Sequence, residues 1–381
     1  YITGYGFGIL SEGNLTAPLA KETKEDWKMY YHSVQSADPL TINFYDANGS
    51  DVSDLASYIS SGYWGTKMNA TKDGYDWYPV LAKEKPVAVN PDSDGLATTW
   101  KFKVRTGADG LKYATNTDKA DLKKFNNRGV ELEDYVYAFK MLLTKKYNLF
   151  RGGELAGKTD NSGIVGAAAY YNGSVDGEND ALFLEKVGVK ADSSDNSITI
   201  TLTAPATPFY AMYNLASNLY QPMPKEFITA IGGTPQNWGR FVEATGLTPV
   251  DTTLSLAPYT LEYWEEGAQT TFKRNPNWFE FNIPELSNRY KIAGVPIRTN
   301  TAIKEDTLAA FNMFLDGQTD ACSIPFEKLA EYKNDPRTTT VTGYSVTKLN
   351  MNACTEDQWE EKFGENGYAK FYFKDRSYER F

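Results

Sequence analysis

Apolar and polar side chains alternate along several stretches of the chain, and this alternation predicts β-strands. Residues 99–105 read T-W-K-F-K-V-R, with an apolar side chain at every second position, which is the period of a strand with one buried face. Residues 259–263 alternate in the same way, and after a Glu-Glu-Gly turn the chain returns through 270–273, so we predict a hairpin here. Shorter apolar runs predict further strands at 27–34, 40–45, 187–190, 198–202 and 346–352.

A period close to 3.6 residues predicts helices elsewhere. Its strongest instance is 131–146, where one face carries the apolar residues Leu132, Tyr135, Val136, Phe139, Leu142 and Leu143. Acidic residues begin this segment and lysines end it, which suits the helix dipole.

The region after residue 282 predicts a different local topology. Residues 304–316 read as a helix whose buried face carries Leu308, Phe311 and Leu315, with Gly317 as its C-cap. Strand-like runs at 292–298 and 321–324 flank this helix. We therefore predict a βαβ unit with a right-handed parallel crossover.

Length and composition limit the class of protein. The 381 residues favour two or three domains, and a hydrophobic content of 41% is sufficient for substantial cores. The formal net charge of −10 argues against nucleic acid as a partner, because phosphate binding requires clustered Lys and Arg. No apolar run is long enough to predict a membrane-spanning helix. Cys322 and Cys354 have neither a CxxC nor a zinc spacing, and the sequence leaves open whether they pair.

Side chains suited to catalysis or metal binding are scarce. His32 is the only histidine, so Ser-His-Asp chemistry would depend on it alone, and a lone histidine is more often a packing residue. Residues 46–54 carry oxygen side chains at alternate positions, but Gly49 stands fourth rather than sixth, which favours a turn before a helix over a calcium loop. Glu265 and Glu266 lie in the predicted hairpin turn, where adjacent acids are usually solvated. We therefore predict no enzyme activity, no metal and no cofactor.

The stretch 257–282 also carries a family resemblance. It reads A-P-Y-T-L-E-Y-W-E-E-G-A-Q-T-T-F-K-R-N-P-N-W-F-E-F-N and resembles the "GPY…L…W…G…RNPNYW" signature of the family 5 extracellular solute-binding proteins, with Ala257 in place of the usual Gly. Residues 130–139, V-E-L-E-D-Y-V-Y-A-F, resemble the "VTAEDFVYSF" segment of that family, with Glu131 at its capping Thr. The resemblance covers about residues 30–352. This family comprises the oligopeptide and dipeptide receptors of ABC importers.

The resemblance implies a fold and a division into domains. The fold class is α/β (α+β mixed), a two-lobed class II periplasmic-binding-protein-like fold with an inserted subdomain in lobe I and an incomplete lobe II. Lobe I would consist of 1–55 and 205–282, the inserted subdomain of 56–204, and the partial lobe II of 283–381, with 40–45 in a sheet that includes strands of 205–282. Considerably more chain follows in the family, so these residues are expected to be part of a longer receptor.

The resemblance implies a function as well. The chain would be the extracytoplasmic substrate-binding component of an ABC importer, a monomer that captures oligopeptides between its lobes and delivers them to the permease. It would lie in the periplasm or on the extracellular face of the membrane, held by a lipid anchor outside this chain. The expected ligand-binding residues are Asp46, Ala47, Asn48, Tyr137 and Tyr259. Two alternatives stay open: a secreted hydrolase, which the missing catalytic groups disfavour, and an oligosaccharide receptor that stacks sugars on Trp64, Trp77 and Trp278.

Overall fold

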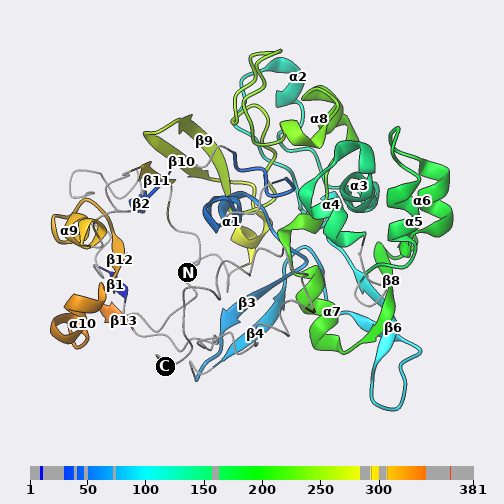
Figure 1. The fold of residues 1–381 in the computed structure, drawn as a ribbon, viewed down its shortest axis with the longest axis horizontal. Helices are drawn as coiled ribbons and strands as arrows, with labels where there is room; N and C mark the ends of the chain where they lie inside the picture. Colours follow the sequence, from blue (N-terminus) through cyan, green and yellow to red (C-terminus); the bar gives the residue numbers. More distant parts are fainter. Residues whose placement is uncertain are drawn as a thin grey trace. The chain divides into compact units, whose positions relative to one another are not determined.

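A computed structural model gives the structure of this protein. It describes residues 9–11, 30–37, 41–46, 50–71, 74–156, 163–283, 292, 294–299, 306, 308–339 and 361. All but the last of these belong to one compact unit, Phe7–Thr342, whose helices and strands are labelled in Figure 1.

The hairpin near residue 265 is part of a four-stranded sheet. The strands lie in the order β2 (Ser33–Gln35), β11 (Gly294–Thr299), β10 (Gln269–Arg274) and β9 (Tyr259–Glu265). β2 and β11 pair in parallel, and the other pairs are antiparallel. The helix α1 (Ser50–Ile59) covers this sheet, since the ring of Tyr58 stacks on that of Phe272 at 4.9 Å. The predicted hairpin, and the helix predicted to follow the turn in 46–54, are confirmed.

One detail of the hairpin differs from the predicted alternation. The pairing register of β9 with β10 skips Glu262, which is a β-bulge. Beyond the bulge the exposed and buried faces exchange, so Tyr263 is 46% exposed although Leu261 is buried. Tyr263 was predicted to share the buried face and does not.

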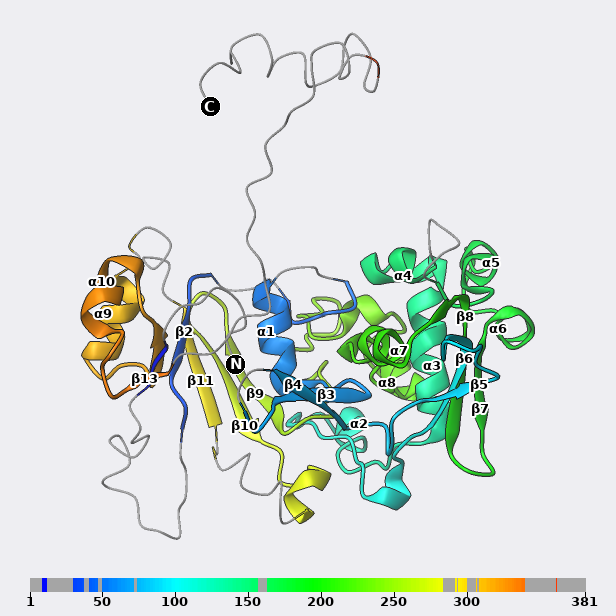
Figure 2. The same ribbon diagram turned by 90° about the horizontal axis from the view of Figure 1, so that it is seen from below.

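A second four-stranded sheet lies within 87–206. Its antiparallel strands are ordered β5 (Val87–Val89), β6 (Ala97–Lys103), β8 (Ser197–Ala206) and β7 (Val189–Asp192), which confirms the predicted strands at 99–105, 187–190 and 198–202. Figure 2 shows α3 (Leu132–Leu143) beside this sheet. α3 confirms the strongest predicted helix, although it ends three residues earlier than its lysines suggested. Its apolar face enters a single large core that extends from Ile42 to Ile297.

Shorter elements surround these two sheets. β3 (Trp64–Met68) and β4 (Tyr75–Pro79) form a separate hairpin. The remaining helices of this part are α2 (Ala120–Lys123), α4 (Phe150–Leu155), α5 (Ala167–Asn172), α6 (Asp180–Lys186), α7 (Pro208–Leu215) and α8 (Lys225–Ala230). A 3-10 turn, η4 (Lys145–Tyr147), follows α3.

The predicted βαβ unit is wrong. β11 belongs to the first sheet, whereas β12 (Ala321–Ser323) pairs antiparallel with β1 (Ile9–Ser11) in a three-stranded sheet completed by β13 (Thr338–Thr339). Both edges of β11 are already used by β10 and β2, so β12 has no place beside it. α9 (Ala309–Leu315) and α10 (Phe326–Tyr332) accompany this small sheet. α9 buries Phe311 and Phe314, while Leu315 is exposed, so the buried face is also displaced from the predicted one.

The predicted strand at 40–45 is wrong in its described part. Residues 41–43 are irregular and 44–46 form a turn. Oδ1 of Asn43 accepts a hydrogen bond from the amide of Tyr45, and Nδ2 of Asn43 donates to the carbonyl of Pro235. The side chain of Asn43 thereby satisfies backbone groups that a strand partner would satisfy. The segment that reaches the first sheet is β2, through β11. The predicted strand at 346–352 and Cys354 lie outside the described residues, and Cys322 is a buried free cysteine.

Candidate functional site

Tyr137 lies on α3 with its side chain buried, at 6% exposure. The Asp134 carboxylate accepts the Glu131 amide at 2.9 Å and so caps the start of this helix, although Glu131 replaces the Thr of the family pattern. The Tyr137 hydroxyl donates a hydrogen bond to Oε1 of Glu178 at 3.0 Å. Burial, and then the negative charge of Glu178, raises the pKa of Tyr137 well above its ordinary value. The hydroxyl therefore remains a donor.

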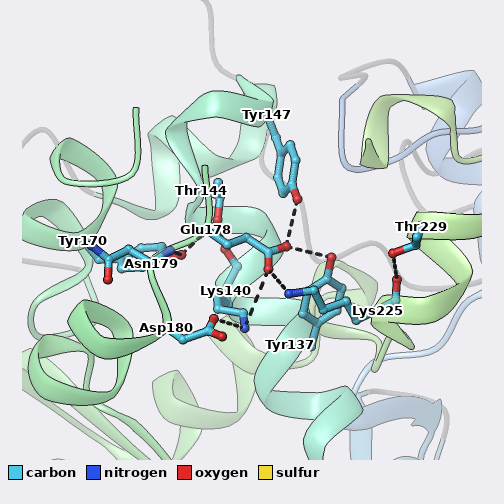
Figure 3. A network of polar contacts seen from close by, with 10 residues as sticks. All are labelled: Tyr137, Lys140, Thr144, Tyr147, Tyr170, Glu178, Asn179, Asp180, Lys225 and Thr229. Atoms are coloured by element: carbon cyan, nitrogen blue, oxygen red, sulfur yellow. Dashed lines mark hydrogen bonds and ion pairs between the residues drawn. The ribbon is translucent and has the colours of Figure 1, made fainter. Parts of the chain in front are cut away.

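The carboxylate of Glu178 is the centre of the polar network in Figure 3. Its Oε1 also accepts a hydrogen bond from the Tyr147 hydroxyl at 2.8 Å, and its Oε2 accepts one from Nζ of Lys225 at 2.7 Å. Burial alone would raise the pKa of Glu178, but the hydrogen bonds from Lys225, Tyr147 and Tyr137 outweigh it and hold the pKa below its ordinary value. Glu178 is therefore a partly buried, ionised carboxylate whose hydrogen bonds come from α3, η4 and α8.

Two lysines approach this carboxylate in different ways. Lys140 lies one turn after Tyr137, pairs with Asp180 at 2.6 Å, and is 3.8 Å from Glu178, with its side chain 14% exposed. Lys225, the first residue of α8, is 52% exposed. Their ammonium groups lie 5.4 and 5.9 Å from the centroid of the Tyr137 ring, within the range of a cation–π contact. A carboxylate, two phenol hydroxyls and an aromatic face together form an environment suited to an organic cation.

Asp46 belongs to a different polar contact. Its Oδ2 pairs with Nη2 of Arg240 at 3.0 Å. The backbone of Arg240 is held on both sides by Thr252, whose Oγ1 accepts from the Arg240 amide and donates to its carbonyl. The Nε atom of Arg240 is buried without a hydrogen-bond partner among the described residues. Ala47 and Asn48, which were predicted to bind ligand with Asp46, lie outside the described residues.

Tyr259 is buried at the start of β9, where its ring packs edge-on against that of Tyr58 at 5.8 Å. Burial raises its pKa to about 12. The neighbouring Asn275 joins the two ends of the hairpin: its amide donates to the carbonyl of Pro258 at 2.7 Å, and its Nδ2 donates to the carbonyl of Ala257 at 3.0 Å. Ala257 does not adopt a positive φ, so the Gly usual at this position is not required.

The tryptophans considered for sugar stacking differ in availability. Trp64 and Trp278 are 2% and 1% exposed, and their indole nitrogens donate to the carbonyl of Glu84 and the carboxylate of Glu280. Trp77 is partly buried. Trp64 and Trp278 therefore present no face to a ligand.

His32 contacts an acid rather than a nucleophile. Its Nδ1 is 3.1 Å from Oδ2 of Asp320, and its carbonyl accepts the Asp320 amide. Within the described ranges, no three His, Cys, Asp or Glu side chains gather as a metal site would require, and no helix has the length and apolar character to cross a membrane.

Sequence reasoning missed Glu178, Lys225 and Arg240 as candidate residues. Glu178 lies in the polar run Gly-Glu-Asn-Asp, which reads as an ordinary surface loop. Its partners lie 41 residues before it and 47 residues after it in the chain, so no local pattern marks the contact. The sequence gives one indication that Lys225 lies in a family segment, because Met-Pro-Lys at 223–225 resembles the "PVPK" segment of the family 5 solute-binding proteins.

The sequence of the chain matches that of a known protein family. Residues 76–369 match the sequence model of the bacterial extracellular solute-binding proteins, family 5, middle region. No curated protein sequence matches the chain.

Solved structures share its fold. OppA of Listeria monocytogenes bound to peptide superposes with a TM-score of 0.57 at 15% identity, covering 81% of this chain and 48% of its own. The substrate-binding domain of an oligopeptide ABC transporter from Bacillus anthracis gives 0.55 at 19% identity, covering 81% and 47%. OppA of Haemophilus influenzae in complex with the peptide RPPGFSPFR gives 0.55 at 17% identity, covering 81% and 49%. The chain thus spans about half the length of these structures, and the predicted mixed α/β fold of a solute-binding protein is confirmed.

Proposed function

Because the chain belongs to family 5 of the bacterial extracellular solute-binding proteins, we propose that it captures oligopeptides as the substrate-binding component of an ABC importer. The family match over residues 76–369 is the observation that carries this proposal. The names of the similar structures support it, since two of them were solved with peptide bound.

The proposal includes the place and the partners of the protein. It acts outside the cytoplasm, in a periplasm or at the outer face of a membrane, and delivers its peptide to permease subunits. It acts as a monomer and is held at the membrane by a lipid anchor.

The peptide lies between two lobes in this proposal. Lobe I consists of 1–55 and 205–282, with 56–204 as an inserted subdomain, and lobe II begins at about residue 283. Two strands cross this division, since β11 pairs with β10 of lobe I and β1 pairs with β12 of lobe II. Backbone groups of a bound peptide then form strand-like hydrogen bonds with the walls of the cleft. The residues of this chain that border the peptide are Asp46, Ala47, Asn48, Tyr137 and Tyr259.

Two features favour a peptide over a sugar or a reaction. Trp64 and Trp278 are buried, so of the three tryptophans considered for sugar stacking only Trp77 has a partly exposed ring. A hydrolase of the Ser-His-Asp type would need a nucleophile beside the single histidine, and among the described residues the His32 ring contacts Asp320 but no hydroxyl or thiol. Binding of a peptide requires neither group.

A thermal-shift experiment tests the proposal. The protein is heated with a pool of tri- to pentapeptides, with a pool of neutral oligosaccharides, and with buffer alone. A ligand at about one hundred times its Kd stabilises the folded state by about 2.7 kcal/mol, which raises the melting temperature by several degrees. We expect this rise with peptides, and mass spectrometry of ligand that co-purifies with the protein then identifies the peptide. A rise with the oligosaccharides alone would overturn the proposal.

A further inference from the structure

We propose that Arg240 is a positioning residue of the peptide site, which holds the Asp46 side chain in place and cancels its charge where Asp46 borders the peptide. This role rests on the proposed function, in which Asp46 is one of the residues beside the peptide. It adds to that function a residue that decides how the site responds to charged peptides.

The chain just before this turn is irregular, but one neighbouring segment, 235–240, holds it. Nδ2 of Asn43 donates to the carbonyl of Pro235 at 2.9 Å, and Oγ1 of Thr41 donates to the carbonyl of Gly239 at 3.2 Å. These four groups are buried or part-buried, and a buried backbone carbonyl requires such a partner. The turn that follows is therefore supported by 235–240 before any ligand binds.

Aromatic packing fixes the same turn from inside the core. The rings of Phe44 and Tyr45 lie 5.0 and 5.6 Å from that of Trp238, and both Tyr45 and Trp238 are fully buried. Asp46 follows them directly, and its side chain is 20% exposed. The turn therefore leaves the core at Asp46, and this is the side chain that it offers to a ligand.

Arg240 is anchored independently of Asp46. Oγ1 of the buried Thr252 accepts a hydrogen bond from the Arg240 amide at 3.2 Å and donates one to the Arg240 carbonyl at 2.8 Å. Nη2 of Arg240 pairs with Oδ2 of Asp46 at 3.0 Å, and within the part of the chain that the structure describes neither side chain has a second ion-pair partner. Nε of Arg240 is buried and makes no hydrogen bond there. Loss of the Asp46 contact would leave this guanidinium with still fewer partners, which favours the closed pair.

The pair joins one cation to one anion, so a peptide side chain beside Asp46 meets a dipole instead of a net charge. Removal of the Arg240 charge would leave a carboxylate facing the ligand. In water, two unit charges about 8 Å apart change an affinity about twofold, with opposite signs for a cationic and an anionic ligand. The two kinds of peptide should then differ by about fivefold.

Calorimetric titration of Ala-Lys-Ala and Ala-Glu-Ala tests this charge balance at about 10 mM ionic strength, where the Debye length is about 30 Å. The measured quantity is the Kd of Ala-Glu-Ala divided by the Kd of Ala-Lys-Ala, in which the shared termini cancel. We expect this ratio to rise about fivefold over the wild type in Arg240→Gln, and to fall in Asp46→Asn. The double variant Asp46→Asn, Arg240→Gln and the charge-keeping variant Arg240→Lys should both return to the wild-type ratio.

Arg337→Gln is the matched control. Arg337 pairs with Asp335 at 3.0 Å, and its side chain is 36% exposed, close to the 38% of Arg240. This variant should keep the wild-type ratio. In about 0.5 M sodium chloride the effect of Arg240→Gln should shrink, because salt screens partly exposed charges. A purely structural loss would instead weaken the binding of both peptides equally at either salt concentration.

Thermal unfolding tests the contact itself without a peptide. If Arg240 holds Asp46, the double variant should melt no lower than the less stable of the two single variants, because the second substitution removes nothing further. Two losses that add would overturn the inference. Peptides that bind all folded variants with one ratio would also overturn it but leave the proposed function intact. A wild type that binds neither peptide would count against the proposed function and, with it, against a role for Arg240 in peptide binding.

Discussion

At the scale of single residues, Glu178 shows how one partly buried charge brings together side chains that are distant in the sequence. Tyr137, Tyr147 and Lys225 donate to it from α3, η4 and α8. Because these donors hold the pKa of Glu178 below its ordinary value, ionisation of this carboxyl stabilises the folded state.

This linkage predicts a dependence of stability on pH. A carboxyl whose pKa is lower in the folded state contributes stability above its unfolded pKa and loses it as the pH falls through its folded pKa. We expect the urea-derived free energy of unfolding to fall more between pH 7 and pH 3 for the wild type than for Glu178→Gln. The variant should be less stable at pH 7 by about 2 kcal/mol, because it loses hydrogen bonds to a charged acceptor. Parallel pH profiles for the two proteins would contradict the assignment.

Tyr137 offers a separate test of its hydroxyl. Tyr137→Phe keeps the buried ring and removes one donor to Glu178, so we expect a loss of stability of about 1 kcal/mol and weaker peptide binding. The larger change Tyr137→Ala would leave a cavity and cost about 3–5 kcal/mol, which would mix folding with binding. Calorimetry on Tyr137→Phe, with circular dichroism as the check on folding, separates the two effects. Unaltered affinity would assign Tyr137 to packing alone.

At the scale of elements, the β9–β10 hairpin depends on Asn275. This side chain is fully buried, donates to the carbonyl of Ala257, and accepts the amide of Asn277 through Oδ1 at 3.0 Å. It therefore closes the base of the hairpin and begins the turn that leads to the buried Trp278.

Replacement of this side chain should be costly. Asn275→Ala leaves one backbone carbonyl and one amide without partners, and we expect it to lower the free energy of unfolding by about 2–3 kcal/mol. Asn277→Ala is the matched control, because the Asn277 side chain is exposed and the substitution keeps the backbone amide that donates to Oδ1 of Asn275. Urea unfolding followed by tryptophan fluorescence measures both variants. A similar loss in the two would show that Asn275 does not close the hairpin.

At the scale of the whole unit, the described residues contain cores of very different size. One cluster joins side chains from Ile42 to Ile297, whereas Phe311, Phe314, Cys322 and Ile324 form a small cluster of their own. A segment with few buried apolar side chains opens at lower free energy than the main core. The region 308–339 should therefore open before the rest of the unit.

Cys322 can report this opening. Burial raises the pKa of its thiol to about 12, so it should react slowly with a disulfide reagent in the closed state. In a Cys354→Ser background, we expect labelling of Cys322 to accelerate at urea concentrations that leave the circular dichroism signal unchanged. Labelling that accelerates only together with the loss of that signal would show that the region unfolds with the main core.

The sequence by itself determined the elements whose signals are local. The alternation at 99–105, the apolar face of α3 and the turn at Gly267 all led to elements that the structure confirms, because side-chain periodicity and turn chemistry act over a few residues. The family signature at 257–282 is likewise local, and the contacts of Asn275 account for part of it.

Only the tertiary structure decided how these elements combine. β11 pairs with β2 and β10, and β12 pairs with β1, which lies more than 300 residues earlier in the chain. Nδ2 of Asn43 donates to the carbonyl of Pro235, and a segment that reads as a strand forms a turn instead. Glu178 accepts hydrogen bonds from Tyr137, which precedes it in the sequence, and from Lys225, which follows it. Which strand pairs with a given sheet edge, and which donor bonds to a given carbonyl or carboxylate, depends on groups that are distant in the sequence. These groups meet only in the folded chain, so a local pattern does not predict their pairing.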